Sequence, residues 1–460
     1  MRLNKTPQGH FTSRVNETEI VLYLTEELLP SDDSLKKLEY MANTFDIHER
    51  IIGLPDLHFK IKNFVPSGMT IPIKSYFSPM LLGPNNDGMG SLRFRISGSQ
   101  LPDEVINKVF EELKKKIVMF RRDEDIIGRD MVDSIFRSGI QDVASDWGFG
   151  QDDLLKFEDQ GCVKQFSADE DLEQYFPKER PESLPPFVPG HEIYERGGKC
   201  IGVLDGTSHF IELFQQDHNI DYDQANSLDL GSRDYFFLIH AGAGDVCLAS
   251  HRGYLDKNDN KYYPGTKIGD AALNSFAVAG NYGHANRLYL YKILREVIEE
   301  CIPGLENVEI LSDVPHDYLE YHTGEDLFIH RKGAAKIFPA DHYPEGHAWS
   351  QTGTPYLFPS CVGGDAYIIT NPQGNPESFN TVSHGAGRLI RKDRAIDLYK
   401  DTSLDDMMKH KIKLFRYGVD QIEGQNPLAF KDIDTILETF KRFNLANAVC
   451  KLKPLASLKA

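Results

Sequence analysis

Cysteine is scarce in this 460-residue chain, and long apolar runs are absent. The six cysteines form no C-x-x-C pair, and none precedes residue 162, which excludes a zinc knuckle and a dithiol redox motif. No stretch of about 18 apolar residues occurs, and the opening residues MRLNKTPQGHFTSR contain no apolar segment of signal-peptide length. We therefore expect a soluble, cytoplasmic protein with mostly reduced thiols and no membrane partner.

Basic residues are also fewer than acidic residues. The chain has 51 Lys and Arg against 69 Asp and Glu, which gives a net charge of -18. Because phosphate binding draws on clustered basic residues, this balance argues against a protein that coats nucleic acid non-specifically. A local basic pocket or bound cations could still hold phosphate groups. With 40% hydrophobic residues, the composition is that of an ordinary globular protein with a substantial core.

Several common catalytic motifs are missing as well. The chain has no G-x-x-x-x-G-K-[ST] phosphate loop, no G-x-S-x-G elbow and no H-E-x-x-H zinc motif. The K-x-D-G signature of lysine-adenylating ligases is absent too, because neither Asp-Gly pair, at 87–88 and 205–206, has Lys two residues before it. A nucleotide-dependent reaction would therefore need another nucleophile.

Short apolar runs predict a mixed α/β sheet core whose loops carry the polar residues. We expect strands at 21–25, 200–206, 234–244, 308–314 and 366–370, and four of these runs lead directly into Gly, Asp or His. Helices are expected at 271–302 and 431–442. No internal repeat or low-complexity linker divides the chain.

Residues 100–185 are the most polar and least regularly patterned part of the chain. The stretch 112–130 has the composition of a helix, and KERPESLPPFVPG, residues 178–190, has that of a loop. We interpret this region as a peripheral insertion that is helical in its first half.

Four histidines follow apolar runs or lie beside small residues. They are His209 in DGTSHFIEL, His240 in FLIHAGAG, His316 in SDVPHDY and His384 in TVSHGAGR. Taken singly, each is more often a structural histidine than a ligand. Together with Asp56, His58 and Asp87 they offer enough imidazole and carboxylate groups for an Mn, Zn or Fe site. The candidates are tens of residues apart, so the sequence alone does not show that they converge.

Asp87 lies in GPNNDGMGS, residues 83–91, among two asparagines and three glycines. Gly, Asn and Asp accept the tight backbone conformations that turns and close approaches need. Both a surface turn with a single acid and a loop around a bound ion fit this composition.

His384 is the best candidate for a nucleophile. The residues that follow, Gly385, Ala386 and Gly387, leave room for a large group to approach the imidazole, and Arg388 adds a cation. A neutral histidine can attack phosphorus to form a phosphoramidate, which divides a difficult transfer into two steps. The alternative is a glycine-rich turn that ends in an exposed arginine.

These motifs resemble those of a known family. LPDLHFK, DGTSHFIEL, LIHAGAG, AVAGNYGHANR, SDVPHDY, HRKGAAKIFP, SHGAGR and the terminal KLKPLASLKA occur in the order found in the RtcB-type RNA ligases. The resemblance runs from about residue 50 to the last residue and is weakest over 100–195. It implies a single-domain RtcB-like α/β fold over residues 1–460, two Mn²⁺ ions and GTP.

The resemblance also implies a reaction. In this family the histidine of HGAGR is guanylylated, GMP passes to an RNA 3′-phosphate, and a 5′-hydroxyl attacks the activated end with release of GMP. A 2′,3′-cyclic phosphate is first opened to the 3′-phosphate. The expected function is thus a GTP- and Mn²⁺-dependent RNA ligase of RNA repair or tRNA splicing. The need for an archease-type activator is left open.

Motif matches assign roles to particular residues. His384 is the expected nucleophile, and Asp56 matches an acid required near the reacting phosphates. The expected nucleotide contacts, besides His384, are Ser208, Glu212, Cys361, Gly385, Ala386, Gly387 and Lys459. The expected metal ligands are Asp87, His209, His240 and His316. Lys332 and Arg388 are expected to contact RNA or its phosphates.

The chain departs from the family pattern around the phosphates. The family's D-I-x-C-G motif has a cysteine that bridges both metals, and alignment on C-G-M-x-x-x-R puts Asp87 at that position, with Asn85 or Asn86 as the nearest further oxygen ligand. A shifted alignment equates Asp87 with the family's Asp and leaves the thiolate unreplaced. The family's G-N-H-F, H-S-G-S-R-G and P-G-S-M-G-T-A-S-Y become S-H-F, HAGAGD and PSCVGGDAY. The chain therefore resembles a divergent paralogue.

Two other functions stay open. A metal-dependent RNA-end phosphatase or cyclic phosphodiesterase could use the same scaffold without GTP. A non-catalytic module that binds RNA or a nucleotide is the third interpretation, and the retained histidines and Lys459 argue against it.

Overall fold

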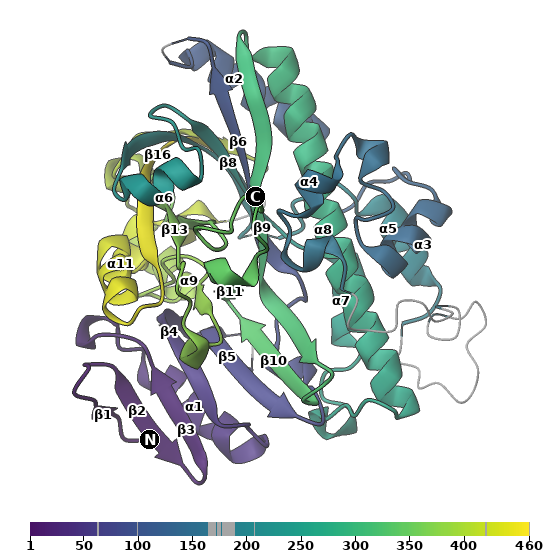
Figure 1. Ribbon diagram of the computed structural model, residues 1–460, viewed down its shortest axis with the longest axis vertical. Coiled ribbons are helices and arrows are strands. Elements are labelled where there is room, and N and C mark those ends of the chain that lie inside the picture. Colours follow the sequence, from purple (N-terminus) through teal and green to yellow (C-terminus); the bar gives the residue numbers. More distant parts are fainter. Residues whose placement is uncertain are drawn as a thin grey trace.

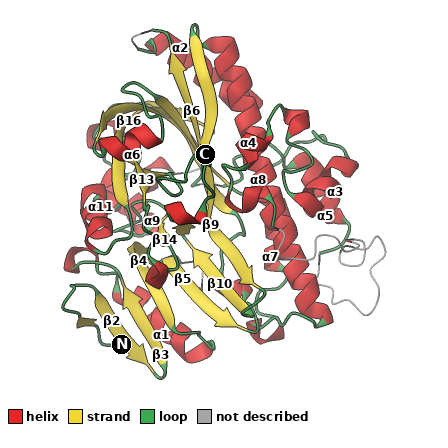
Figure 2. Ribbon diagram, in the orientation of Figure 1, coloured by secondary structure: helices red, strands yellow, loops and turns green. Residues whose placement is uncertain are grey.

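The computed structural model describes residues 1–61, 64–98, 100–163, 172, 176, 189–206, 208–418 and 421–459. Among them, fourteen strands join into one mixed sheet, and β11 (Ala334–Lys336) pairs separately with β14 (Thr381–Ser383). Figure 2 shows the strands running through the body of the molecule with helices around them. The expected mixed α/β fold, with a central sheet and surrounding helices, is confirmed.

The large sheet joins segments that are far apart in the sequence. Its spatial order is β1 (Asn4–Lys5), β2 (Phe11–Val15), β3 (Thr18–Leu22), β4 (Arg50–His58), β5 (Ser67–Lys74), β10 (Leu327–Lys332), β9 (Leu305–His322), β6 (Asp87–Ile96), β8 (Tyr235–Ala241), β7 (Phe210–Asn219), β16 (Asn447–Lys459), β13 (Ala366–Thr370) and β12 (Tyr356–Pro359). β15 (Lys413–Arg416) pairs with β16. Neighbouring strands are antiparallel except β3 with β4 and β15 with β16.

Helices of very different length surround this sheet. They are α1 (Asp32–Thr44), α2 (Asp103–Lys116), α3 (Arg129–Ser138), α4 (Gln151–Leu154), α5 (Glu192–Lys199), α6 (Tyr222–Ser227), α7 (Gly244–Arg252), α8 (Lys267–Cys301), α9 (Lys392–Tyr399), α10 (Leu404–Met407) and α11 (Ile433–Arg442). Within the described ranges, no helix combines the length and the apolar character needed to cross a bilayer.

The helix α8 is the main support of the sheet. Thr266 caps it by accepting a hydrogen bond from the backbone N–H of Gly269. Most of its side chains are buried, as expected for a helix enclosed on both sides. In Figure 1, α3 and α5 lie on one side of α8 and the sheet lies on the other. Tyr282 of α8 contacts Phe136 of α3, with ring centroids 6.1 Å apart.

Most of the expected elements are present with shifted ends. The strands expected at 234–244, 308–314 and 366–370 correspond to β8, β9 and β13, and the one expected at 21–25 overlaps the end of β3. The helices expected at 271–302 and 431–442 correspond to α8 and α11. These segments have the strongest apolar periodicity, which is the most dependable signal in a sequence.

Two expectations are wrong, the continuous helix over 112–130 and the strand over 200–206. The helix is interrupted, because α2 ends at Lys116 and α3 begins only at Arg129. Between them Val118 forms a parallel bridge with Val203, and this bridge is the only strand-like pairing described within 200–206. Pairing with a distant segment thus overrides the local helical preference. The loop expected at 178–190 lies largely outside the described residues.

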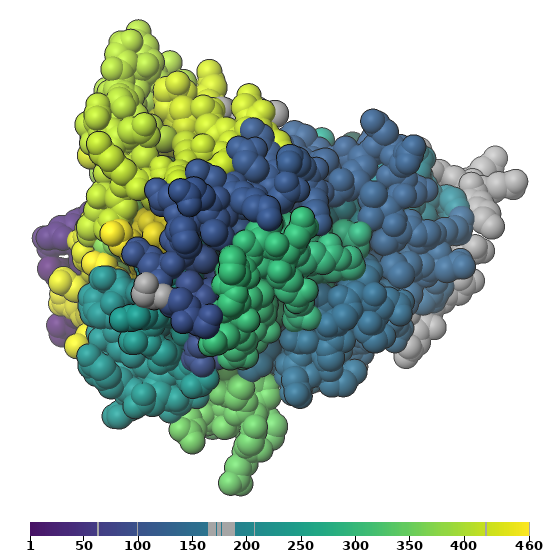
Figure 3. Space-filling model, turned by 90° about the horizontal axis from the view of Figure 1, so that it is seen from above, coloured from purple at the N-terminus to yellow at the C-terminus, as the bar shows by residue number. Residues whose placement is uncertain are grey.

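The described helices of the 100–195 segment pack closely against the rest of the molecule. Buried side chains of α2, α3 and α5, among them Phe110, Phe136 and Tyr194, share one apolar cluster with α8 and the sheet. The part of this segment that contains α2 to α4, drawn in blue, occupies much of the face seen in Figure 3. Its status as a peripheral insertion, like the single-domain organisation, stays a prediction.

Replacing Phe237 by alanine tests this core. Phe237 is fully buried on β8, and its ring lies 5.7 Å from Phe94 and 6.1 Å from Phe110. The cavity should lower the free energy of unfolding by about 3–5 kcal/mol in urea denaturation. The control Tyr222→Ala, at a side chain 67% exposed, should change it by less than about 0.5 kcal/mol. Equal effects of the two variants would contradict the packing described.

Candidate active site

Four neighbouring strands bring distant polar residues to one place in the large sheet. These strands lie in the order β9, β6, β8, β7. Met89 of β6 pairs with His240 of β8 on one side and with Val314 of β9 on the other. His240 in turn pairs with Phe210. Because side chains alternate along a strand, this register decides which residues share a face.

Four histidines form a continuous row. In the order His209, His240, His316, His384, the ring centroids of neighbours are 4.3, 5.0 and 4.8 Å apart. All four line one cleft together with Asp87, which we call the histidine cleft. The structure therefore brings together the four histidines that the sequence separates by tens of residues.

The two central histidines have buried ring nitrogens without hydrogen-bond partners among the described residues. These atoms are Nδ1 and Nε2 of His240 and Nδ1 of His316. Burial and the neighbouring His209 hold the pKa of His240 well below its usual value, and burial and His384 do the same for His316. A neutral imidazole with an unused lone pair is the form that binds a metal ion.

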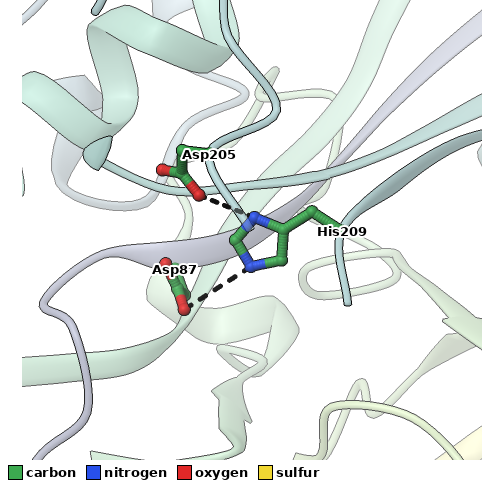
Figure 4. Close-up of side chains that lie close together, drawn as sticks. All are labelled: Asp87, Asp205 and His209. Carbon is green, nitrogen blue, oxygen red and sulfur yellow. Dashed lines mark ion pairs between the residues drawn. The ribbon is translucent and has the colours of Figure 1, made fainter. Parts of the chain in front are cut away.

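His209 lies between two carboxylates (Figure 4). Asp205 Oδ1 is 2.7 Å from His209 Nδ1, and Asp87 Oδ2 is 3.6 Å from His209 Nε2. Asp205 thus orients the ring so that Nε2 faces Asp87, and the three groups lie close enough to hold a metal ion. Sequence reasoning missed Asp205. Its position four residues before His209, in one of the two Asp-Gly pairs, was the available signal.

The loop that carries Asp87 is anchored to α8 by its two asparagines. Asn85 donates to Phe276 O and accepts from Leu319 N. Asn86 donates to Gly280 O, and its Oδ1 accepts a hydrogen bond from Arg287. The amide oxygens of Asn85 and Asn86, either of which was expected as the nearest further metal ligand, are therefore both engaged within the protein. Asp87 is the side chain of this loop that faces the histidines.

Among the described residues, His384 is held by hydrogen bonds at Nδ1. Its Nδ1 lies 2.7 Å from Asp56 Oδ2 and 3.0 Å from Gly333 O. Two acceptors at Nδ1 fix the proton there, so Nε2 keeps its lone pair. Its ring lies 4.8 Å from that of His316. His384 can therefore act as a nucleophile toward a group bound beside the histidine row.

Asp56 is fully buried under the segment that contains His384. Gly387 has φ of +71°, and a Cβ there would lie 2.7 Å from Asp56 Cβ, so only glycine lets the two segments approach so closely. Lys431 donates to Pro55 O at 2.8 Å and to Leu57 O at 3.0 Å, the carbonyls on either side of Asp56. These contacts fix the carboxylate that orients His384.

The sequence profile of the tRNA-splicing ligase RtcB family matches residues 37–460. The chain belongs to the RtcB family. The resemblance inferred from the motifs is thereby confirmed.

Relatives from this family are distant. A protein of Thermococcus kodakarensis named tRNA-splicing ligase RtcB is 25% identical over 64% of this chain and 66% of its own length. A protein of the same name from Pyrococcus furiosus is 24% identical over 67% of this chain but only 35% of its own length. One from Methanococcus maripaludis is 22% identical over 95% of this chain and 94% of its own. The matched segments thus span about two thirds and one third of the first two relatives.

The residues expected to contact the nucleotide in an RtcB protein share the cleft. The histidine cleft is lined by Ser208, Glu212, Cys361, Gly385, Ala386, Gly387 and Lys459. Burial raises the pKa of Glu212 to about 7, an effect that Lys459 partly opposes. Glu212 Oε1 is buried without a hydrogen-bond partner in the described part of the chain, so it can accept from a ligand. Lys459 Nζ lies 4.4 Å from the ring centroid of Phe210.

The two cations expected to contact RNA lie in different settings. Arg388 lines the histidine cleft, donates to Gly424 O at 2.7 Å and lies over the ring of Phe430. Lys332 is buried and paired with Asp317, so its charge is already compensated. Sequence reasoning missed a further cation of the cleft, Lys60, which follows His58 by two residues.

The donor set of the cleft fits a hard or borderline divalent ion. Asp87, His209, His240 and His316 would hold it through one carboxylate and three imidazoles, which suit Mn²⁺, Zn²⁺ or Fe²⁺. Asp205 lies at the Nδ1 side of His209 and fixes the orientation of that ring. Cys361 is the one described cysteine that lines the cleft. Among the described residues, the ligand atoms of Asp87, Asp205 and His209 lie within 4.8 Å of one another, and His240, His316 and Cys361 are outside that group.

Replacing Asp87 tests its role as a ligand. Asp87→Ala should lower the Mn²⁺ bound per chain and weaken the remaining binding about tenfold or more, whereas Asp87→Cys should keep a ligand and retain binding. Isothermal titration with Mn²⁺ and metal analysis after gel filtration measure both. The exposed Asp217 offers the matched control Asp217→Ala. Full Mn²⁺ occupancy in Asp87→Ala would refute the assignment.

Proposed function

We propose that this protein is a GTP- and Mn²⁺-dependent RNA ligase that joins 3′-phosphate or 2′,3′-cyclic phosphate ends to 5′-hydroxyl ends. The observation that carries the proposal is the setting of His384. Its Nδ1 is bound by Asp56, and its ring extends the row of histidines suited to metal ions. Membership of the RtcB family supports the same class of reaction.

His384 performs the covalent step. Its Nε2 attacks the α-phosphorus of GTP, a nitrogen–phosphorus bond forms, and pyrophosphate leaves with the electrons of the broken phosphorus–oxygen bond. Asp56 accepts a hydrogen bond from Nδ1–H and stabilises the positive charge that develops on the ring. Glu212, as a carboxylate, accepts hydrogen bonds from the guanine base.

The RNA end completes the cycle. An oxygen of the 3′-phosphate attacks the phosphorus held by His384, and the bond to nitrogen breaks. The 5′-hydroxyl then attacks the activated RNA phosphorus, and GMP leaves. Bound divalent ions would polarise the phosphoryl oxygens and supply positive charge that this acidic chain lacks.

A second candidate function is an RNA-end phosphatase or cyclic phosphodiesterase that does not use GTP. It is favoured by the altered segments around the phosphates, with Ser208 in place of the family's Asn and HAGAGD without the Arg of the family's H-S-G-S-R-G. The presence of Glu212 and Lys459 in the cleft favours the ligase instead.

A ligation assay distinguishes these functions. One RNA ending in a 3′-phosphate and another beginning with a 5′-hydroxyl should be joined when GTP and Mn²⁺ are both present. His384→Ala should reduce joining about a thousandfold or more, since the nucleophile is lost. The exposed His218 provides the control His218→Ala, which should join RNA at the wild-type rate.

Two results would contradict the proposal. Joining that continues without GTP would exclude the guanylylation step. Release of phosphate from the 3′-phosphate RNA without GTP, in the absence of any joined product, would favour the phosphatase.

The selectivity for GTP over ATP should depend on pH. Because burial raises the pKa of Glu212 to about 7, this carboxyl is protonated at lower pH and then accepts hydrogen bonds from guanine less well than the carboxylate does. The ratio of GTP to ATP affinity should therefore fall several-fold between about pH 8 and about pH 6. Titration of each nucleotide at both pH values measures this. Glu212→Gln should show a low ratio without pH dependence, and an unchanged pH dependence in that variant would contradict the role of Glu212.

A further inference from the structure

Lys60 is a cation of the histidine cleft that forms no ion pair with any described residue, although the charges of Asp317 and Asp87 act on it. It lies two residues beyond the end of β4 and lines the cleft together with His384 and Arg388. Among the described residues, its ammonium group makes no hydrogen bond or ion pair. Its carbonyl accepts a hydrogen bond from Lys37 Nζ at 2.8 Å, which helps to fix the segment.

The carboxylates around Lys60 are engaged elsewhere. Asp317 is paired with Lys332 and accepts from Gly333 N at 2.7 Å. Asp56 holds His384. Burial and the nearby Lys332 lower the pKa of Lys60 to about 8, so its amine is still mostly protonated at neutral pH. A partly buried ammonium group without a counter-ion is unfavourable until an anion binds.

The surroundings of Lys60 indicate which anion this is. Its charged neighbours are Lys332, Asp317, Asp87 and Arg388. Glu212 instead has Lys459 as its charged neighbour, at the part of the cleft assigned to guanine. Lys60 is therefore associated with the metal ligand Asp87 and with Arg388 rather than with the base-binding residues.

A second hollow adjoins the histidine cleft at His58 and Arg388, which line both. It has a volume of about 650 Å³. Arg391, Arg394 and Phe59 also line it. A polynucleotide lying there would bring its terminal phosphate past His58 toward His384, whose rings are 6.5 Å apart.

We propose that Lys60 binds the terminal 3′-phosphate of the RNA strand and so selects phosphorylated ends. This rests on the proposed function, which it deepens by naming the residue that recognises the RNA end. The 3′-phosphate would take the position of the missing counter-ion beside Arg388 and the divalent ions.

The test compares binding of two RNA oligonucleotides that differ only in a 3′-phosphate or a 3′-hydroxyl end. Fluorescence anisotropy with Mn²⁺ and without GTP should show tighter binding of the phosphorylated end by the wild type. Lys60→Met should reduce that preference about tenfold, the effect of one lost charge-assisted hydrogen bond, and Lys60→Arg should retain most of it. Lys74→Met, at the exposed end of β5, is the matched control and should keep the preference.

Three results would overturn the assignment. The first is a wild type that does not distinguish the two ends. The second is a Lys60→Met variant that keeps both the preference and GMP attachment. The third is a Lys60→Met variant that keeps the preference but loses GMP attachment. The last would assign Lys60 to the phosphates of GTP. Failure of the proposed function is separate, because absence of GMP attachment and joining in the wild type leaves the end preference measurable in the same titration.

Discussion

The register of the strands β9, β6, β8 and β7 is the constraint on which the candidate active site depends. His240 pairs with Met89 on one side and Phe210 on the other, so it neighbours both the loop of Asp87 and His209. A shift of one residue would turn His240 to the opposite face of the sheet and end the row of histidines. The apolar cluster between the sheet and α8 opposes such a shift, because these faces would lose their packing.

The same helix holds the loop of Asp87 in place. Arg287 on α8 is fully buried and paired with Asp313 of β9, and it also donates to Asn86 O. A Cβ at Gly88 would lie 2.7 Å from this guanidinium, so glycine is needed for the approach. The glycines and asparagines around Asp87 thus serve close packing against a helix. The result is a fixed carboxylate beside His209, at one end of the row of histidines, in a protein that is acidic overall.

Motifs and periodicity predicted much of the fold and of the candidate site, but not its supporting contacts. The helix α8 and the strand β13 were predictable because their apolar patterns are long or regular. The strand expected at 200–206 does not form in the described part of the chain, where Val203 makes a single bridge with the distant Val118. Asp205 and Lys60 were missed for a related reason: their roles follow from which groups surround them in space.

The central claim is that His384 is a nucleophile whose Nδ1 is held by Asp56 and whose Nε2 is left to react. Intact-mass measurement after incubation with GTP and Mn²⁺, followed by peptide mapping, tests it most directly. The account predicts one GMP group, located on the peptide that contains His384 and absent from His384→Ala. A wild-type protein that gains no GMP with any of several divalent ions, or gains it on a different residue, would contradict the account.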